Sequence, residues 1–177
     1  MTIESKVIEQ ASRIRMIILD VDGVMTDGIT HVHSDGCESK GFSIRDGFAI
    51  IMAKRCGLEF AIITGLKSSI IEYRAERLHI DEVHQGFEDK AEILKGILKR
   101  RGINPDQTAY IGDDLFDLPP MRICGLSGAP ADAHEDVLAR VSWVSKHKGG
   151  QGAVREFIEF ILKARGDYEE VLRQFTD

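Results

Sequence analysis

Three groups of polar residues, most of them acidic, each follow an apolar run of the sequence. The groups are Asp20-Val21-Asp22, Thr64-Gly65 and Gly112-Asp113-Asp114. If the apolar runs are strands of an open α/β sheet, their carboxyl ends form the edge at which ligands bind, and the groups share one site. Carboxylates gathered there would repel one another without a cation, and oxygen ligands of this kind suit Mg²⁺ beside a substrate phosphate. Any one of these acids alone would be taken as a helix cap or turn residue, but polar groups at three strand ends favour a shared site.

Two further features of the sequence suit a phosphate group. Thr64 can donate its hydroxyl, and the backbone at Gly65 can approach a phosphate closely at the start of a helix. Lys90 begins a helical segment and can place a point charge on phosphoryl oxygens. Taken alone, it would be read as a solvated surface lysine. Its place in the order Asp-x-Asp, Thr, Lys, Gly-Asp-Asp makes it a candidate phosphate ligand.

The rest of the sequence supplies the elements that would position these residues. Strand-like apolar runs alternate with segments of helical periodicity, the pattern of a mostly parallel sheet covered by helices. Strands are expected at residues 16–19, 60–63, 109–111, 124–126 and 141–144. Helices are expected in the N-terminal segment and at residues 47–55, 68–78, 91–101, 153–164 and 167–177. The expected fold class is therefore α/β.

One segment breaks the alternation of strands and helices. Residues 28–42 have alternating character on both sides of Ser34-Asp35-Gly36, a strong turn signal, which predicts a projecting β-hairpin. The stretches 27–64 and 64–90 leave no room for an inserted domain. We therefore expect a single domain over residues 1–177, with no cap domain over the site apart from the hairpin.

The composition excludes several classes of protein. The chain has 177 residues with 23 Lys and Arg against 29 Asp and Glu, a formal charge of −6, which argues against nucleic acid or an anionic membrane as the main partner. No apolar run approaches the ~20 residues that span a bilayer, and the first fifteen residues show no secretory signal. Cys37, Cys56 and Cys124 have no disulfide or zinc spacing. A reducing, cytoplasmic setting is expected.

In order and spacing, the motif set resembles the four signature motifs of the haloacid dehalogenase-like (HAD) phosphatases over nearly the whole chain. The resemblance implies a Rossmann-like three-layer sandwich. It implies that Asp20 is the nucleophile that forms an aspartyl-phosphate and that Asp22 is the general acid and base. It also implies that Thr64, Gly65 and Lys90 hold the phosphate.

The same resemblance implies a Mg²⁺ site. The ligands would be the carboxylates of Asp20 and Asp113, the backbone carbonyl of Asp22, the phosphate and water. Asp114 and Asp117 would support the metal ligand Asp113 without binding the ion themselves.

A closer resemblance is to the 3-deoxy-D-manno-octulosonate 8-phosphate (KDO 8-phosphate) phosphatases, a capless branch of that superfamily. Besides the motifs above, it is carried by residues 26–28, 42–47, 85–86, 131–133 and 149–156. It implies Mg²⁺-dependent hydrolysis of KDO 8-phosphate in lipopolysaccharide precursor synthesis. It also implies a homotetramer in which the hairpins meet at the centre and a neighbouring subunit covers the open site.

An eight-carbon sugar acid carries a carboxylate as well as a phosphate, so an acidic enzyme must supply local positive charge for it. Arg45 and Arg74 are the candidates, with Gln85 as a hydrogen-bond donor to hydroxyls, on family likeness more than on physics. The alternatives are a surface arginine for Arg45 and a helix-face arginine paired with an acid for Arg74.

One position departs from the family pattern. Members with this substrate usually carry Arg after Thr-Gly, where this chain has Leu66 followed by Lys67. Lys67 or Arg77 could compensate, although lysine is no bidentate substitute for arginine. The departure leaves a nine-carbon sugar-acid 9-phosphate (KDN or sialic acid), or a broad range of sugar phosphates, as the alternative substrate. Arg45-Asp46-Gly47 resembles the KDO type.

Two readings of other kinds carry less weight. A signalling receiver domain also uses an aspartyl-phosphate, Thr and Lys, but its acid pair precedes the phosphoacceptor and its Lys comes last. His31 and His33 share one face of a strand and could form a metal pair, but no third ligand is near in sequence. An exposed hairpin face is the simpler interpretation of the two histidines.

Overall fold

A parallel sheet of six strands forms the centre of the computed structural model, which describes residues 3–176. Its strand order is β5-β4-β1-β6-β7-β8, and every neighbouring pair is parallel. The strands are β1 (Met16–Leu19), β4 (Glu59–Thr64), β5 (Glu82–Gln85), β6 (Thr108–Ile111), β7 (Leu126–Ala129) and β8 (Trp143–Val144). Because β1 lies between β4 and β6, the strand order reverses beside it, where such sheets bind their ligands.

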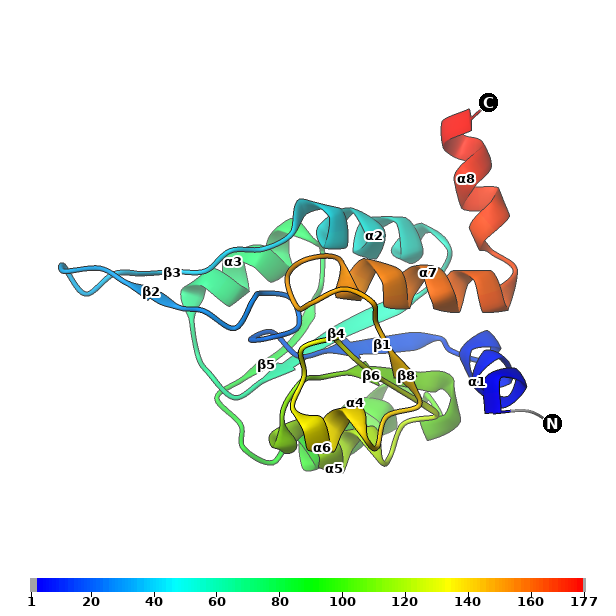
Figure 1. The fold of residues 1–177 in the computed structure, drawn as a ribbon, viewed down its shortest axis with the longest axis horizontal. Helices are drawn as coiled ribbons and strands as arrows, with labels where there is room; N and C mark the ends of the chain where they lie inside the picture. Colours follow the sequence, from blue (N-terminus) through cyan, green and yellow to red (C-terminus); the bar gives the residue numbers. More distant parts are fainter. Residues whose placement is uncertain (1–2, 177) are drawn as a thin grey trace.

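Helices cover both faces of the sheet and complete the three layers that the sequence predicts (Figure 1). On one face lie α1 (Ile3–Ser12), α2 (Ile44–Arg55), α3 (Ser69–Arg77) and α7 (Ala153–Arg165). On the other lie α4 (Lys90–Arg101), α5 (Leu118–Met121) and α6 (Glu135–Leu138). The last helix, α8 (Tyr168–Thr176), follows α7 at the outer edge of the molecule (Figure 1). Within the described residues, no helix has the length and apolar character needed to cross a membrane.

The strand β1 is apolar on both faces because helices cover both. Ile17 and Leu19 pack on the side of α2 and α7, whereas Ile18 packs on the side of α4, and all three are fully buried. Leu19 pairs with Ile62 of β4 and with Ile111 of β6. The three central strands therefore end at nearly the same level, and the residues that follow them meet at one edge.

A two-stranded antiparallel hairpin projects from this edge (Figure 1). It consists of β2 (His31–Val32) and β3 (Glu38–Ser39), joined by a turn in which Gly36 has a φ of 84°. The residues of both strands are exposed. The predicted hairpin is confirmed. Between β1 and β4 the described chain contains only this hairpin and α2.

The structure corrects several boundaries. The sequence pattern does not predict β5, because this strand at the edge of the sheet has a single apolar side chain, Val83. The strand predicted at 124–126 is wrong in both bounds, because β7 spans Leu126–Ala129. Its start is set by Gly125, which donates its N–H to the carbonyl of Pro105 (2.8 Å). Ser43 caps α2, which therefore begins at Ile44 rather than at residue 47. The short helices α5 and α6 are also absent from the prediction, and its last helical residue, 177, lies outside the described residues.

The edge strand β5 is held by ion pairs from α4. Glu82 lies 2.7 Å from Arg100, 3.1 Å from Arg101 and 2.6 Å from the His84 ring. Partial burial of Glu82 raises its pKa, but hydrogen bonds from these three partners outweigh that effect and lower the pKa from 4.5 to about 2.

Because the folded-state pKa lies below the unfolded one, Glu82 contributes stability above about pH 4.5 that is lost as the pH falls towards 2. We expect Glu82→Gln to lower the free energy of unfolding at neutral pH and to match the wild type near pH 2. Urea denaturation across this pH range measures the difference. A gap that persists unchanged at the acid end would contradict this cause.

Candidate active site

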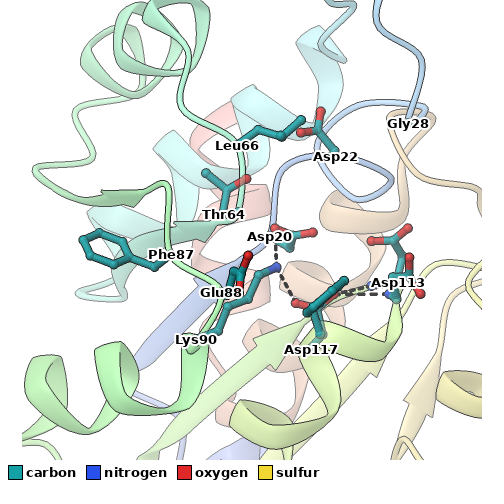
Figure 2. A pocket seen from close by; sticks show the side chains of 13 residues that line it. Asp20, Asp22, Gly28, Thr64, Leu66, Phe87, Glu88, Lys90, Asp113 and Asp117 are labelled. Carbon is teal, nitrogen blue, oxygen red and sulfur yellow. Dashed lines mark hydrogen bonds and ion pairs between the residues drawn. The ribbon is translucent and has the colours of Figure 1, made fainter.

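A pocket of about 440 Å³ opens at the carboxyl ends of β1, β4 and β6. All eight residues that the sequence predicts for nucleophile, acid and base, phosphate and metal line it: Asp20, Asp22, Thr64, Gly65, Lys90, Asp113, Asp114 and Asp117. Figure 2 shows side chains from several elements directed into one space. The structure thus brings together residues that lie up to 97 positions apart in the sequence (117 − 20 = 97).

Asp20 and Lys90 form the buried centre of this pocket. Asp20 is 6% exposed and Lys90 is 5% exposed, and the ammonium lies 2.8 Å from Asp20 Oδ1 (Figure 2). Burial and the neighbouring charge of Asp117 raise the pKa of Asp20, which Lys90 opposes. Burial lowers the pKa of Lys90, but the two carboxylates outweigh it and raise that pKa, so the lysine stays charged. The interpretation of Lys90 as a surface lysine is wrong.

Asp117 connects this pair to the loop that carries Asp113. One of its oxygens accepts hydrogen bonds from Lys90 (2.7 Å) and from the Tyr110 hydroxyl (2.8 Å). The other accepts the backbone N–H groups of Asp113 (3.0 Å) and Asp114 (3.2 Å). Because both oxygens are already engaged, Asp117 suits the supporting role predicted for it. Tyr110 was missed by sequence reasoning, although a tyrosine within a buried apolar strand is a signal for a polar partner.

The donors in this pocket fit a hard divalent cation. Carboxylate oxygens of Asp20, Asp113 and Asp117 lie within 4.8 Å of one another. Because hydrogen bonds engage both oxygens of Asp117, Asp20 and Asp113 are the two that would hold an ion directly. Burial, followed by the charges of Asp117 and Asp114, raises the pKa of Asp113 to about 7. A cation would remove this penalty by pairing with the ionised carboxylate, and an all-oxygen donor set suits Mg²⁺.

Mg²⁺ is therefore expected to raise the melting temperature. A hundredfold excess over its Kd stabilises a folded protein by about 2.7 kcal/mol. Because the ion binds the ionised carboxylate, the rise should be larger above about pH 7 than below it. Differential scanning fluorimetry at several pH values measures this, with Asp81→Asn as an exposed control. If Asp113→Asn showed the full rise, the ion would bind elsewhere.

Asp22 also lines the pocket (Figure 2). Its Oδ1 is 2.5 Å from the ammonium of Lys40, a residue at the base of the hairpin. Its Oδ2 is enclosed and has no hydrogen-bond partner. Sequence reasoning missed Lys40, because nothing in the hairpin pattern distinguishes it from the polar residues around it.

The loop that carries Asp22 is packed against a glycine-rich segment. Gly150 donates its N–H to the carbonyl of Val24 (2.9 Å), and a Cβ at Gly149 would lie 1.8 Å from the carbonyl oxygen of Gly23. The segment is anchored in turn by Asp46, which accepts the N–H groups at the start of α7. The segment is therefore a tightly packed turn before α7.

The three residues predicted to bind the sugar do not line the pocket. Arg74 donates to the carbonyl of Ser43 (3.0 Å), and its guanidinium lies 5.4 Å from the centre of the Phe42 ring. Burial lowers its pKa. Arg74 thus braces the start of α2.

The side chain of Gln85 accepts the N–H of Ser68 (2.8 Å) and donates to Glu72 (3.2 Å), so it supports the start of α3. Arg45 is exposed on the first turn of α2. Substrate binding by these residues stays a prediction. Leu66, in contrast, lines the pocket and is 59% exposed.

The doubly wound sheet and the acids, threonine and lysine at its strand ends define a hydrolase of the haloacid dehalogenase-like class. The family model for haloacid dehalogenase-like hydrolases matches residues 60–158. Over 97% of this chain and 92% of the relative, the sequence is 41% identical to 3-deoxy-D-manno-octulosonate 8-phosphate phosphatase KdsC of Escherichia coli (strain K12). The Yersinia pestis enzyme of the same name is 44% identical over 92% of this chain and 87% of its own length.

Solved structures agree with these relatives. The Moraxella catarrhalis phosphatase of this name, in complex with a magnesium ion, a phosphate ion and KDO, has a TM-score of 0.95 at 36% identity and covers 97% of this chain and 98% of its own. The Yersinia pestis crystal structure has a TM-score of 0.91 at 43% identity and covers 93% of this chain and 89% of its own. The chain therefore belongs to the KDO 8-phosphate phosphatase branch of the haloacid dehalogenase-like hydrolases.

Proposed function

We propose that this enzyme hydrolyses KDO 8-phosphate to KDO and inorganic phosphate, with Mg²⁺ as cofactor. The observation that carries the proposal is the buried Asp20–Lys90–Asp117 cluster at the base of a pocket with a divalent-cation donor set. The substrate is supported by the similarity over nearly the whole chain to phosphatases of that name. Supply of KDO for lipopolysaccharide in the cytoplasm is the role that follows from this proposal.

The first half of the reaction uses three parts of the pocket. Asp20 attacks the phosphorus, forming an Asp20–phosphorus bond while the bond from phosphorus to the sugar oxygen breaks. Lys90, Thr64 and the backbone at Gly65 hold the phosphoryl oxygens, and Asp22 gives a proton to the departing sugar oxygen. In the second half, Asp22 takes a proton from water, which attacks the phosphorus and releases Asp20.

The Mg²⁺ site would be formed by the carboxylates of Asp20 and Asp113 and by the carbonyl of Asp22. Bound there, the ion neutralises charge on the phosphate and on the carboxylates around it. Asp117 and Asp114 support the loop of Asp113. The test of this proposal is phosphate release from KDO 8-phosphate with Mg²⁺ and after its chelation. Rates that are equal in the two conditions, or absent in both, would contradict it.

We further propose that residues 1–177 form one domain and that four copies assemble through the hairpins. Val32 is 71% exposed on a hairpin whose outer edges are unpaired, a surface that needs a partner. Leu66 and Phe116 form an exposed apolar rim on the pocket, which a neighbouring copy would cover.

Sedimentation velocity is expected to show a tetramer for the wild type and smaller species for Val32→Glu, because a buried charge would oppose assembly. Glu38→Gln, a change on the same hairpin without a new charge, serves as the control. A wild-type monomer at the working concentration would contradict hairpin-mediated assembly.

A further inference from the structure

Lys40 is a buried cation in an otherwise exposed hairpin. The residues of β2 and β3 are exposed, yet the side chain of Lys40, directly after β3, is only 1% exposed. Lysine is seldom buried without a partner. Here the partner is Asp22, 18 residues away in the sequence and on the wall of the catalytic pocket. The base of the hairpin is therefore tied directly to the acid and base residue of the proposed reaction.

The orientation of the Asp22 carboxylate depends on this contact. Oδ1 is held by the Lys40 ammonium at 2.5 Å, and no other described side chain donates to the carboxylate. Oδ2 is enclosed without a partner. The Lys40 ammonium therefore fixes the orientation of the whole Asp22 carboxylate at the pocket wall.

We propose that Lys40 is a positioning residue that holds Asp22 for proton transfer to the leaving group. This contact links the base of the hairpin to the catalytic pocket, while the exposed strands of the hairpin take no part in it. The inference deepens the proposed function and rests on its assignment of Asp22 as general acid. Lys40 does not itself line the pocket. Its effect is exerted through Asp22.

The chemistry of the leaving group separates this role from a purely structural one. A sugar alkoxide departs slowly unless it receives a proton, whereas p-nitrophenolate departs without one. The parameter kcat/KM reports steps up to the formation of the aspartyl-phosphate. Misplacing Asp22 therefore lowers kcat/KM for a sugar phosphate and spares p-nitrophenyl phosphate, while damage to the fold lowers both.

The experiment compares Lys40→Met with the wild type on KDO 8-phosphate and on p-nitrophenyl phosphate. Methionine keeps most of the apolar stem and removes the ammonium. We expect kcat/KM for KDO 8-phosphate to fall about tenfold or more, part of the roughly 10²–10⁴-fold that general acid catalysis supplies, with little change for p-nitrophenyl phosphate. Hydrolysis of the aspartyl-phosphate still needs Asp22, so the variant should also show a burst of p-nitrophenolate. Glu38→Gln, on the exposed part of the hairpin, should leave both substrates unchanged.

A double variant tests whether Lys40 acts through Asp22. In an Asp22→Asn background, Lys40→Met should cause no further loss on KDO 8-phosphate, because the group that it positions is already gone. Equal losses on both substrates, additive losses in the double variant, or no loss at all would overturn the proposal. Wild-type rates on KDO 8-phosphate and on a hexose 6-phosphate test the proposed function separately. The sugar phosphate that the wild type prefers is then the one on which Lys40→Met is compared with p-nitrophenyl phosphate.

Discussion

Replacing Asp20 by asparagine is expected to abolish phosphate release while the fold persists. The amide cannot attack phosphorus, and removal of a catalytic nucleophile typically lowers kcat by about 10⁴-fold or more. Asparagine has nearly the same size, so the packing at the end of β1 is preserved. Lys90 also keeps its second carboxylate partner, Asp117. Steady-state assays of phosphate release and a thermal melt of the same sample measure the two properties.

The matched control is Asp81→Asn, the same chemical change at an exposed position outside the pocket. It should leave both the rate and the melting temperature unchanged. An Asp20→Asn enzyme with a near-normal rate would contradict the aspartyl-phosphate mechanism, because no covalent intermediate could then form on this residue. A variant that is inactive because it is unfolded would be recognised by the thermal melt, and Asp20→Glu then provides a second test: its longer side chain keeps the charge but misplaces the attacking oxygen.

Lys90→Met is expected to destabilise the protein strongly in the absence of Mg²⁺. The change leaves Asp20 and Asp117 without the cation that both contact, and breaking a buried pair of this kind costs about 3–5 kcal/mol. The two carboxylates raise the pKa of Lys90, so its charge is present at neutral pH and is lost only as the pH rises above its usual value of 10.5. Urea denaturation with a chelator at neutral pH measures the loss.

Lys99→Met, on the exposed face of the same helix, is the control and should change the free energy of unfolding by less than about 0.5 kcal/mol. Added Mg²⁺ should recover part of the stability of Lys90→Met, because the ion also neutralises the carboxylates. Phosphate release should remain impaired, since the lysine contacts the proposed nucleophile directly. Equal stability of Lys90→Met and the wild type would contradict the role of Lys90 in holding the buried acids.

The central strands were predictable because they are short apolar runs covered on both faces. The run at 16–19 coincides with β1, and that at 109–111 lies within β6. Edge strands carry a weaker signal: β5 alternates polar side chains around Val83, and its place is set by pairing with β4. The start of β7 depends on a contact of Gly125 with a turn some twenty positions earlier, which no local pattern reveals.

The acids of the pocket were predictable from their spacing, but the state of the residues around them was not. The burial of Lys90 follows from contacts with Asp20, 70 residues away, and the contact of Lys40 with Asp22 depends on how the hairpin returns to the domain. Tyr110 lies beneath the pocket for the same reason. Such pairs depend on the tertiary arrangement of strands and loops rather than on local pattern.

The substrate-binding residues were the least predictable part of the site. The guanidinium of Arg74 is used by a structural partner, the carbonyl of Ser43 just before α2. Gln85 has such partners on and before α3. Within the pocket lining, Lys90 is the only basic residue, and it is already paired with two carboxylates. Cations for the sugar carboxylate are therefore expected from outside this lining, in which Leu66 is an apolar residue.

The identity of the substrate is tested most directly by competition in one tube. KDO 8-phosphate, KDN 9-phosphate and a hexose 6-phosphate are mixed at equal concentration with enzyme and Mg²⁺, and each is followed by ³¹P NMR. Their relative rates of loss give the ratios of kcat/KM without separate calibration. We predict that KDO 8-phosphate disappears first, with a kcat/KM about tenfold or more above that of either other substrate. Earlier loss of KDN 9-phosphate, or equal loss of all three, would contradict the assignment to KDO 8-phosphate.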